Sequence, residues 1–502
     1  MPSNPFDRLT TKVRWKARLN RWRDGLMRPL RPTRIAPDRP GPANLLLVGI
    51  DTLRADHLGY AGYSLPTSPQ LDRLATGGVV FEDVTAAAPW TLPSFSSSLT
   101  ARMPGLHGAY LAGDVRNMDN QPPARLAENV TTLATHLQSM GYKTAAFYSN
   151  QFFAFGLAES FAEHTYINLP AAEVARQAED WMRRHADQPF FCFILLNDPH
   201  EPTTPEATDL APFLPQLTAQ GINTDDKTVS AFSRWGEAPG PVLTAAKYPA
   251  DEPTRHACQV KIAVYDATIR YVDRVIGKLQ ENLEKRDLAR STLVSVYSDH
   301  GEEFLDHANF ANQWGHDPRG INGIGHGHAH FQEVLSVPWL AWGAGVPVGQ
   351  KFKQPVSLLD LAPTLLDWLG LPAMPAWPDV PEEWQMLLGG VSQGVRGNES
   401  NGSRIILSEA IAFGPDLVSL RRENYKLIAH RDGRVLALFD LNQDPRELKD
   451  VSQEYPELVA ELTGFLARWR DCGFGATGRQ DANWNDMDDT VRQRLKDLGY
   501  SE

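Results

Sequence analysis

Thr91 is the residue with the clearest potential for chemistry in this chain. It lies in the segment APWTLPS (residues 88–94), before a run that predicts a helix from about Phe95 to Arg102. Pro93 favours the first helical turn, because its missing N–H is not needed there. We therefore expect Thr91 at a helix N-terminus, where unpaired N–H groups and the positive dipole end attract anions. Its hydroxyl either caps the helix or attacks a phosphorus or sulfur centre held there.

Polar side chains follow four short apolar runs at the point where each run ends. They are Asp51, Asn150, Asp198 with His200, and Asp299 with His300. A single Asp in such a place commonly forms a turn or caps a helix, but four such places indicate one shared site. Asp51, Asp299 and His300 form a ligand set that suits a divalent ion such as Mn²⁺, Mg²⁺ or Zn²⁺. Such an ion would lower the pKa of the Thr91 hydroxyl, which makes Thr91 a candidate ligand as well.

A second group of histidines lies in GHGHAH (residues 325–330), which holds His326, His328 and His330. In an extended segment these alternate residues would point to one face. The run is either a metal-binding surface loop or a source of acid–base groups. His200 and either His326 or His328 are our candidates for protonating a leaving group or holding its non-bridging oxygens. A variant in which Asp198, His200 and His326 hold a second ion stays open.

The sequence predicts that strands alternating with helices position these residues. Residues 44–50, 143–148, 190–196 and 292–297 are apolar runs that fit strands buried on both faces of a parallel sheet. Helix-like segments lie between them, for example over residues 259–283. This alternation predicts an α/β fold with a mostly parallel sheet. Ligands bind at the carboxyl ends of the strands in such sheets, where the candidate residues fall.

Composition is that of a globular protein. The 502 residues are 42% hydrophobic and 22% charged, and the net charge of −12 argues against a polyanion-binding role for the whole chain. Three widely spaced cysteines (Cys192, Cys258 and Cys472) predict no disulfide framework and favour a reducing compartment. No apolar run reaches the roughly 18 residues of a membrane span, and the first residues lack a signal-peptide pattern. We therefore expect a cytoplasmic protein.

The first 42 residues differ from the rest. The first 39 hold eleven Lys or Arg against three Asp, with Trp15 and Trp22 among the basic residues, and a Pro-rich linker follows over residues 31–42. Such a segment binds an anionic membrane surface peripherally, contacts another subunit of a homo-oligomer, contacts nucleic acid, or remains a solvated extension. We expect a contact with a membrane surface or another subunit.

The remaining chain divides into two predicted parts. Residues 43–400 form the catalytic α/β domain, with a Pro-, Thr- and Ala-rich insertion over residues 203–255. Residues 401–502 form a C-terminal subdomain and tail. Short strand-like runs followed by a helix-like run over residues 456–470 predict a small α+β unit there.

Taken in order, these motifs resemble the sulfatase family of the alkaline phosphatase superfamily. They are NLLLVGIDTLRADHLG (44–59), TLPS (91–94), LTARMP (99–104) with His107-Gly108, DPHEP (198–202), SDHGE (298–302), HGHAHFQE (326–333) and LFDLNQDPRE (438–447). The resemblance implies an alkaline-phosphatase-like fold, in which helices flank a mostly parallel sheet beside a small C-terminal α+β subdomain. It also implies a bound divalent metal and hydrolysis of esters.

Three departures from the family pattern change the expected chemistry. Typical sulfatases carry Cys-x-Pro-x-Arg and convert the Cys or a Ser to formylglycine, whereas this chain has Thr91 and Phe95 at those two positions. Thr cannot give that aldehyde, and members with Thr there resemble phosphodiesterases and phosphotransferases. Thr52 replaces the family's second Asp, which puts the usual calcium site in doubt. With His300 in the ligand set, Mn²⁺ or Zn²⁺ is favoured, although Mg²⁺ or Ca²⁺ also fits.

The sequence thus predicts a metal-dependent hydrolase of phosphate, phosphodiester or sulfate esters with Thr91 as the nucleophile. The substrate is a small molecule or a lipid or glycan ester, and Asn150 and His107 are candidates for binding it. The alternative is a non-catalytic protein of the same fold that binds an anionic ligand or partner.

Overall fold

The computed structural model describes residues 44–471, apart from 119–120, 226–227, 230–250, 315–316, 320–322, 378–379, 382–383 and 385–403. Three predictions lie wholly or partly outside these residues. They concern the basic N-terminal segment (1–42), part of the insertion, and the C-terminal tail. The division of the remaining chain at residue 400 stays a prediction. Within the described residues, every helix is too short or too polar to span a lipid bilayer.

An eight-stranded mixed sheet forms the centre of the catalytic part. In spatial order its strands are β12 (Gln350–Phe352), β2 (Val79–Phe81), β11 (Trp339–Gly343), β8 (Thr292–Ser298), β1 (Asn44–Ile50), β7 (Phe190–Leu196), β5 (Lys143–Tyr148) and β6 (Glu163–Tyr166). All of its pairings are parallel except those of β11 with β8 and β2. This confirms the predicted α/β class with a mostly parallel sheet.

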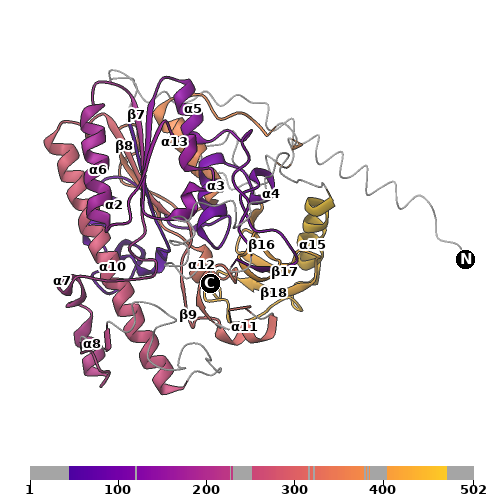
Figure 1. The fold of residues 1–502 in the computed structure, drawn as a ribbon. Helices are drawn as coiled ribbons and strands as arrows, with labels where there is room; N and C mark the ends of the chain where they lie inside the picture. The colour runs from indigo at the N-terminus through magenta and orange to yellow at the C-terminus, as the bar shows by residue number, and fades with distance from the viewer. Residues whose placement is uncertain are drawn as a thin grey trace, which may run out of the picture. The chain divides into compact units, whose positions relative to one another are not determined.

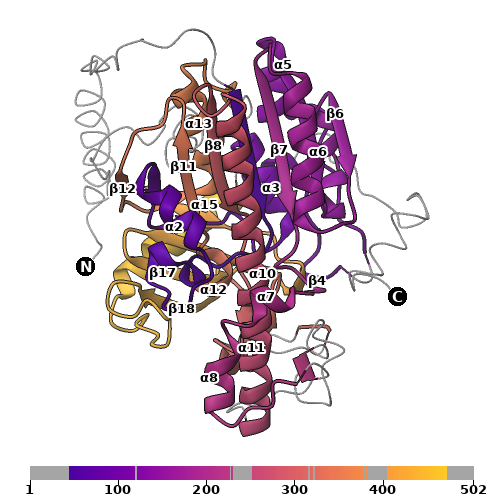
Figure 2. The same cartoon turned by 90° about the vertical axis from the view of Figure 1, so that its left-hand side faces the viewer.

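Helices cover both faces of this sheet (Figure 1, Figure 2). One face carries α2 (Pro69–Thr76), α6 (Ala171–Arg184) and α10 (Glu252–Lys285), and the other carries α3 (Thr91–Thr100), α5 (Leu133–Ser139) and α13 (Leu361–Leu369). Side chains of a strand alternate between faces. Leu45 and Leu47 of β1 accordingly join one core cluster, whereas Leu46 and Val48 join the other. A strand buried on both sides must be apolar at every position, as the β1 sequence is.

The predicted insertion contains two short helices, α7 (Ala207–Leu210) and α8 (Leu214–Ala219), in its described part. The helix after it starts earlier than the sequence pattern indicates, because Asp251 caps it and accepts a hydrogen bond from the Thr254 N–H. The resulting α10 is 34 residues long. It packs against α2, α6 and α7 and so reaches from the insertion to the sheet.

A four-stranded antiparallel sheet follows in the C-terminal part, in the order β14 (Ile406–Ser408), β16 (Leu417–Arg422), β17 (Tyr425–His430) and β18 (Val435–Asp440). The helix α15 (Pro456–Asp471) packs against it through Leu462, Phe465 and Leu466. This is the α+β arrangement that the sequence predicts.

Short elements connect these parts. The two-stranded pairs are β13 (Val356–Ser357) with β3 (Val84–Thr85), β15 (Phe413–Pro415) with β4 (Val115–Asn117), and β10 (Ile324–Gly325) with β9 (Glu303–Phe304). Three short helices are α4 (Pro104–His107), α11 (Ala308–Trp314) and α12 (Gln332–Leu335). Glu302 directly precedes β9 and His326 directly follows β10, and both belong to the site described next.

Candidate active site

The candidate site lies at the carboxyl ends of four neighbouring parallel strands. Asp51 follows β1, Asp299 follows β8, Asn197 follows β7, and Asn150 comes two residues after β5. Because parallel strands end at the same sheet edge, the topology brings these side chains together. The exposed fraction is 0% for Asp51, Asn150 and Asp299. The predicted convergence of Asp51, Asn150 and Asp299 therefore appears in the structure.

Thr91 reaches the same place from the first residue of α3. Its Oγ1 lies 3.4 Å from His300 Nε2 and 3.4 Å from Asn150 Nδ2. The helix starts four residues earlier than the sequence pattern suggests, and Trp90, in extended conformation, precedes it. Thr91 is thus inside the first turn, and 1% of it is exposed. The hydroxyl is held against the strand ends and is not a cap of the helix by hydrogen bonding, since α3 has no side-chain cap.

Close packing between α3 and the sheet fixes this position. A Cβ on Gly49 would lie 2.6 Å from Phe95 Cε1, so only glycine in β1 allows the helix to approach this closely. Phe95 packs edge-to-face on Phe153, Phe193 and Tyr297 inside the core. The position at which typical sulfatases carry Arg is therefore part of the apolar core here. Ser94 Oγ adds a hydrogen bond to the Asp299 carbonyl at 2.7 Å, which ties the helix to β8.

Asn150 has a defined amide orientation. Its Oδ1 accepts a hydrogen bond from the Phe152 N–H at 2.8 Å, which directs the Nδ2 group toward the site. Nδ2 lies 2.5 Å from Asp51 Oδ2 and 3.0 Å from Asn197 Oδ1, in addition to its contact with Thr91. Asn150 is thus a fixed donor beside the Thr91 hydroxyl, as expected for a group that binds a substrate oxygen.

The tautomer of His300 follows from its contacts. Its Nδ1 lies 2.9 Å from the Gly301 carbonyl oxygen, which can only accept, so Nδ1 carries the proton. In the neutral ring Nε2 then carries the lone pair. Nε2 lies 3.3 Å from Asp51 Oδ1 and 3.4 Å from Asp299 Oδ2. Metal-binding histidines usually have this arrangement, in which one ring nitrogen donates to a carbonyl and the other faces the metal.

Two carboxylate oxygens in this cluster lack a hydrogen-bond donor from the protein. Ligand atoms of Asp51, Asp299 and His300 lie within 4.8 Å of one another, and Asp51 Oδ1 and Asp299 Oδ2 are buried without a hydrogen-bond donor. Burial lowers the pKa of His300, but Asp299 and Asp51 outweigh it and raise the pKa to about 9. Burial and the Asp51 charge raise the pKa of Asp299 well above its usual range. A divalent cation would satisfy the two carboxylate oxygens, so the residues present fit a metal.

Backbone strain accompanies the site at Thr52. Its φ is 57°, in the left-handed region that β-branched residues rarely adopt. The Tyr265 hydroxyl donates to its carbonyl at 2.6 Å and holds it there. The Thr52 hydroxyl is buried without a partner. Thr52 therefore offers no carboxylate in place of the family's second Asp, and the strain lies beside Asp51.

Two further histidines line the site. The ring centre of His326 lies 4.4 Å from that of His300 and 4.9 Å from that of His200. His326 Nδ1 contacts Glu302 Oε2 at 2.9 Å, and His200 Nδ1 donates to the Glu201 carbonyl at 2.7 Å. The structure therefore places His200 and His326 next to the candidate metal ligands, as the sequence predicts.

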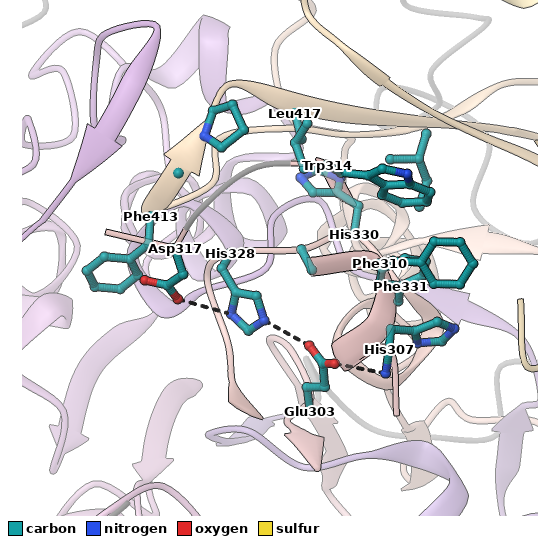
Figure 3. Close-up of a pocket in the computed structure, with 14 residues that line it drawn as sticks. Glu303, His307, Phe310, Trp314, Asp317, His328, His330, Phe331, Phe413 and Leu417 are labelled. Atoms are coloured by element: carbon teal, nitrogen blue, oxygen red, sulfur yellow. Dashed lines mark hydrogen bonds and ion pairs between the residues drawn. The ribbon is translucent and has the colours of Figure 1, made fainter. Parts of the chain in front are cut away.

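His328 lies in a different place. It faces a pocket bordered by β9, β15 and aromatic side chains (Figure 3). There its Nε2 contacts Glu303 Oε2 at 2.8 Å, and its Nδ1 lies 4.0 Å from Asp317 Oδ2. The cavity of about 30 Å³ has room for about one or two waters and not for an ester substrate. The choice left open between His326 and His328 is thus resolved in favour of His326 by position.

Two other predicted residues are engaged elsewhere. His107 is fully buried, and its ring contacts Ser97 Oγ at 3.0 Å and accepts from the Ala109 N–H at 3.1 Å. Burial lowers its pKa to about 3. His107 therefore joins α3 to the turn after α4, and these contacts do not support substrate binding. Both oxygens of Asp198 accept from the Ala171 N–H at the start of α6, which does not support its proposed role as a ligand of a second ion.

Sequence reasoning missed three residues near the site. Asn197 is the first residue after β7, so the strand-end rule covers it, but the sequence prediction names only the neighbouring Asp198. Glu302 stands in the SDHGE motif and contacts His326. Lys261 on α10 is 2% exposed and pairs with Glu201 at 2.5 Å. No local signal in the sequence marks Lys261, because only the fold brings α10 to the strand ends.

A second buried cluster also has metal-like composition. Ligand atoms of His307, Glu333 and Glu447 lie within 4.8 Å of one another. His307 Nε2 donates to the Arg446 carbonyl at 2.9 Å, and its Nδ1 lies 2.6 Å from Glu333 Oε1. Lys426 Nζ lies 2.8 Å from Glu447 Oε1. A lysine ammonium thus already supplies positive charge to this cluster.

Comparison with known proteins identifies relatives of this arrangement. The sequence model of the Sulfatase family matches residues 43–371. Human arylsulfatase K is 27% identical over 304 residues, which are 57% of this chain and about half (53%) of that relative. The Delta 4,5-hexuronate-2-O-sulfatase of Bacteroides thetaiotaomicron is 22% identical over 476 residues, 85% of this chain and 89% of that protein.

Solved structures share the fold. The crystal structure of a phosphonate monoester hydrolase of Agrobacterium radiobacter superposes with a TM-score of 0.58 at 19% sequence identity. The match covers 86% of this chain and 95% of the other. At this level of identity the likeness concerns the fold.

Proposed function

This chain belongs to the sulfatase family of ester hydrolases, and from that premise we propose that it cleaves phosphoesters with Thr91 as the nucleophile. The observation that carries the proposal is the position of the Thr91 hydroxyl. It lies 3.4 Å from both His300 and Asn150, beside the two unpaired carboxylate oxygens. A hydroxyl in that environment can be activated as a nucleophile, and it is not converted to an aldehyde as a Cys would be.

The candidate metal ligands are Asp51, Asp299 and His300, with the Thr91 hydroxyl beside them. A divalent ion bound there lowers the pKa of that hydroxyl and offsets negative charge on the substrate oxygens. We favour Mn²⁺ or Zn²⁺, because a His in the ligand set suits these ions better than Ca²⁺.

The protein groups divide the remaining work. Asn150 Nδ2 donates to a non-bridging oxygen in place of one of its present acceptors, Asp51 Oδ2 or Asn197 Oδ1, and so orients the phosphorus toward Thr91. The Thr91 hydroxyl releases its proton to solvent, and its oxygen forms a bond to phosphorus as the bond to the leaving oxygen breaks. His326 or His200 gives the leaving oxygen a proton, and Thr91 takes a proton back from solvent when the phosphothreonine is hydrolysed. Water then attacks the phosphothreonine, gives up a proton to the same imidazole, and releases the phosphoryl product. The family's sulfate chemistry is reflected in the names of the relatives, one of which is a hexuronate-2-O-sulfatase.

A substrate and metal panel tests this proposal. The purified chain is assayed on 4-nitrophenyl phosphate, bis(4-nitrophenyl) phosphate, a phenylphosphonate ester and 4-nitrophenyl sulfate, each with Mn²⁺, Zn²⁺, Mg²⁺ or Ca²⁺. We expect the highest kcat/KM on a phosphorus ester with Mn²⁺ or Zn²⁺. Higher kcat/KM on the sulfate would contradict the phosphoester preference.

A non-catalytic role is the second candidate, favoured by the burial of Phe95 in the core, where the family carries a cation. Stoichiometric metal binding without turnover of any ester in the panel would support it. Turnover that depends on Thr91 would exclude it.

A further inference from the structure

Glu302 and Glu303 are adjacent acids whose side chains go to opposite faces of the β9–β10 pair. Glu303 pairs with Gly325 and Phe304 with Ile324 in this antiparallel ladder. Continued by one residue, the same register sets Glu302 opposite His326. Alternation along the extended chain then sends Glu302 toward the candidate site and Glu303 toward the pocket of Figure 3.

We infer that Glu302 is a positioning residue that fixes the His326 ring for proton transfer at the Thr91 site. The inference rests on the proposed function and names the group that sets the proton donor. Glu302 Oε2 holds Nδ1 of the ring at 2.9 Å, and the ring lies among those of His300 and His200. With Nδ1 bound to the carboxylate, Nε2 is the nitrogen that exchanges a proton with the leaving oxygen or with water.

The main chain holds Glu302 from both sides. Its N–H donates to the Glu333 carbonyl at 3.1 Å, and its carbonyl accepts from Arg54 Nη1 at 3.0 Å. Its side chain is 5% exposed, against 10% for His326. Because the Glu302 backbone is fixed and its side chain is buried, the carboxylate restricts the orientation of the His326 ring. A positioning residue needs this property.

The chain supplies its own control. Glu303 Oε2 contacts Nε2 of His328 at 2.8 Å on the opposite face from Glu302, and its Oε1 also accepts from the His307 N–H at 2.9 Å. The cavity at His328 is too small for an ester. Loss of the Glu303 contact therefore tests the structural cost of removing a buried Glu–His pair without touching the Thr91 site.

Leaving-group dependence separates positioning from structural support. The substrates are a series of aryl methyl phosphodiesters from 4-nitrophenyl to unsubstituted phenyl. They are assayed with the full-length wild type and with Glu302→Ala, Glu302→Gln, His326→Ala, Glu303→Gln and the double variant that combines Glu302→Ala with His326→Ala. A good leaving group departs without a proton, whereas a poor one needs an acid. Metal content is measured for each variant.

We expect Glu302→Ala to lose about 10-fold in kcat on the 4-nitrophenyl ester and about 10²–10³-fold on the phenyl ester. Glu302→Gln should recover part of that loss, because the amide oxygen still accepts from Nδ1. The double variant should be no slower than His326→Ala, and Glu303→Gln should show the wild-type dependence on the leaving group.

Two outcomes contradict this account in different ways. Equal losses across the series, or additive losses of Glu302→Ala and His326→Ala, would overturn the role of Glu302 while leaving the proposed function intact. A wild type that binds metal but turns over none of the esters would overturn the proposed function itself, and the inference with it.

Discussion

Two buried clusters in this protein have the same composition, two carboxylates and one imidazole, yet their surroundings differ. In the first, formed by Asp51, Asp299 and His300, two carboxylate oxygens have no donor. In the second, His307 uses both ring nitrogens, one toward a carbonyl and one toward Glu333. Lys426 supplies the second cluster with positive charge.

Composition and spacing alone therefore do not identify a metal site in this protein. What separates the clusters is whether a lone pair and unpaired oxygens face a common point. Nδ1 of His300 donates to the Gly301 carbonyl, so Nε2 is the nitrogen that offers a lone pair when the ring is neutral. In the second cluster both ring nitrogens of His307 already contact protein acceptors and Lys426 contacts Glu447, so these residues supply partners for one another. We therefore expect metal chemistry at the first cluster and structural stabilisation at the second.

The largest effect should follow removal of an acid from the first cluster. Asp299→Ala should abolish metal binding and lower kcat/KM by at least about 10⁴-fold, because both charge neutralisation and activation of the hydroxyl are lost. Glu447→Gln in the second cluster should retain the metal. Inductively coupled plasma mass spectrometry of both dialysed variants checks this, and metal retained by Asp299→Ala would break the comparison.

Removal of the cation from the second cluster should cost stability. Lys426 and Glu447 are each at most 1% exposed, so Lys426→Met leaves a buried carboxylate uncompensated, at about 3–5 kcal/mol of unfolding free energy. Urea unfolding with saturating metal measures it. Lys426→Met combined with Glu447→Gln is the matched control and should regain part of the loss. A change below about 1 kcal/mol would show that the pair contributes little.

Thr91 should affect chemistry without affecting either cluster. Thr91→Ala should lower kcat by about 10²–10³-fold, since a water must attack from a poorer position. Thr91→Ser keeps the hydroxyl and should retain measurable activity, and metal content should be unchanged in both. Full activity of the Ala variant would show that another group is the nucleophile.

The smallest effect concerns pH. Burial lowers the pKa of His307, but the hydrogen bond and charge of Glu333 outweigh burial and raise this pKa to about 9. The folded protein therefore holds a proton that the unfolded chain, with a pKa of about 6.5, releases. This stability is fully present below about pH 6.5 and is lost as pH rises through 9. His307→Gln should remove about 2–3 kcal/mol of the difference in unfolding free energy between pH 6 and pH 9. Identical pH profiles for variant and wild type would contradict it.

The sequence predicted the fold and part of the site for specific physical reasons. The apolar β1 run and its terminal Asp51 are local signals, since burial on both faces and a polar strand end are visible in order along the chain. The pairing of Asp51 with Asp299 follows from the parallel topology that those signals indicate.

The remainder needed the tertiary structure. The periodicity of GHGHAH predicts His326 and His328 on one face, but Gly327 between them has a φ of 81°, so the segment is not extended and the two rings contact different acids. His107 belongs to a motif that resembles the family's nucleophile segment, and only the structure shows its ring bonded to Ser97 of α3. Lys261 lies on α10 and Glu201 lies in the segment after β7, far earlier in the sequence, so their approach has no local signature.

The most direct test of the central claim is to find the transferred group on Thr91. During turnover of a phosphodiester with Mn²⁺ or Zn²⁺, the enzyme is quenched in acid, digested and analysed by tandem mass spectrometry. We expect one transferred group on Thr91, a phosphoryl that keeps the ester substituent that was not displaced, in the peptide containing TLPS, and its absence from Thr91→Ala and from unreacted enzyme. A phosphoryl group on Ser94, or turnover with no modified peptide under conditions in which phosphothreonine standards survive, would contradict it.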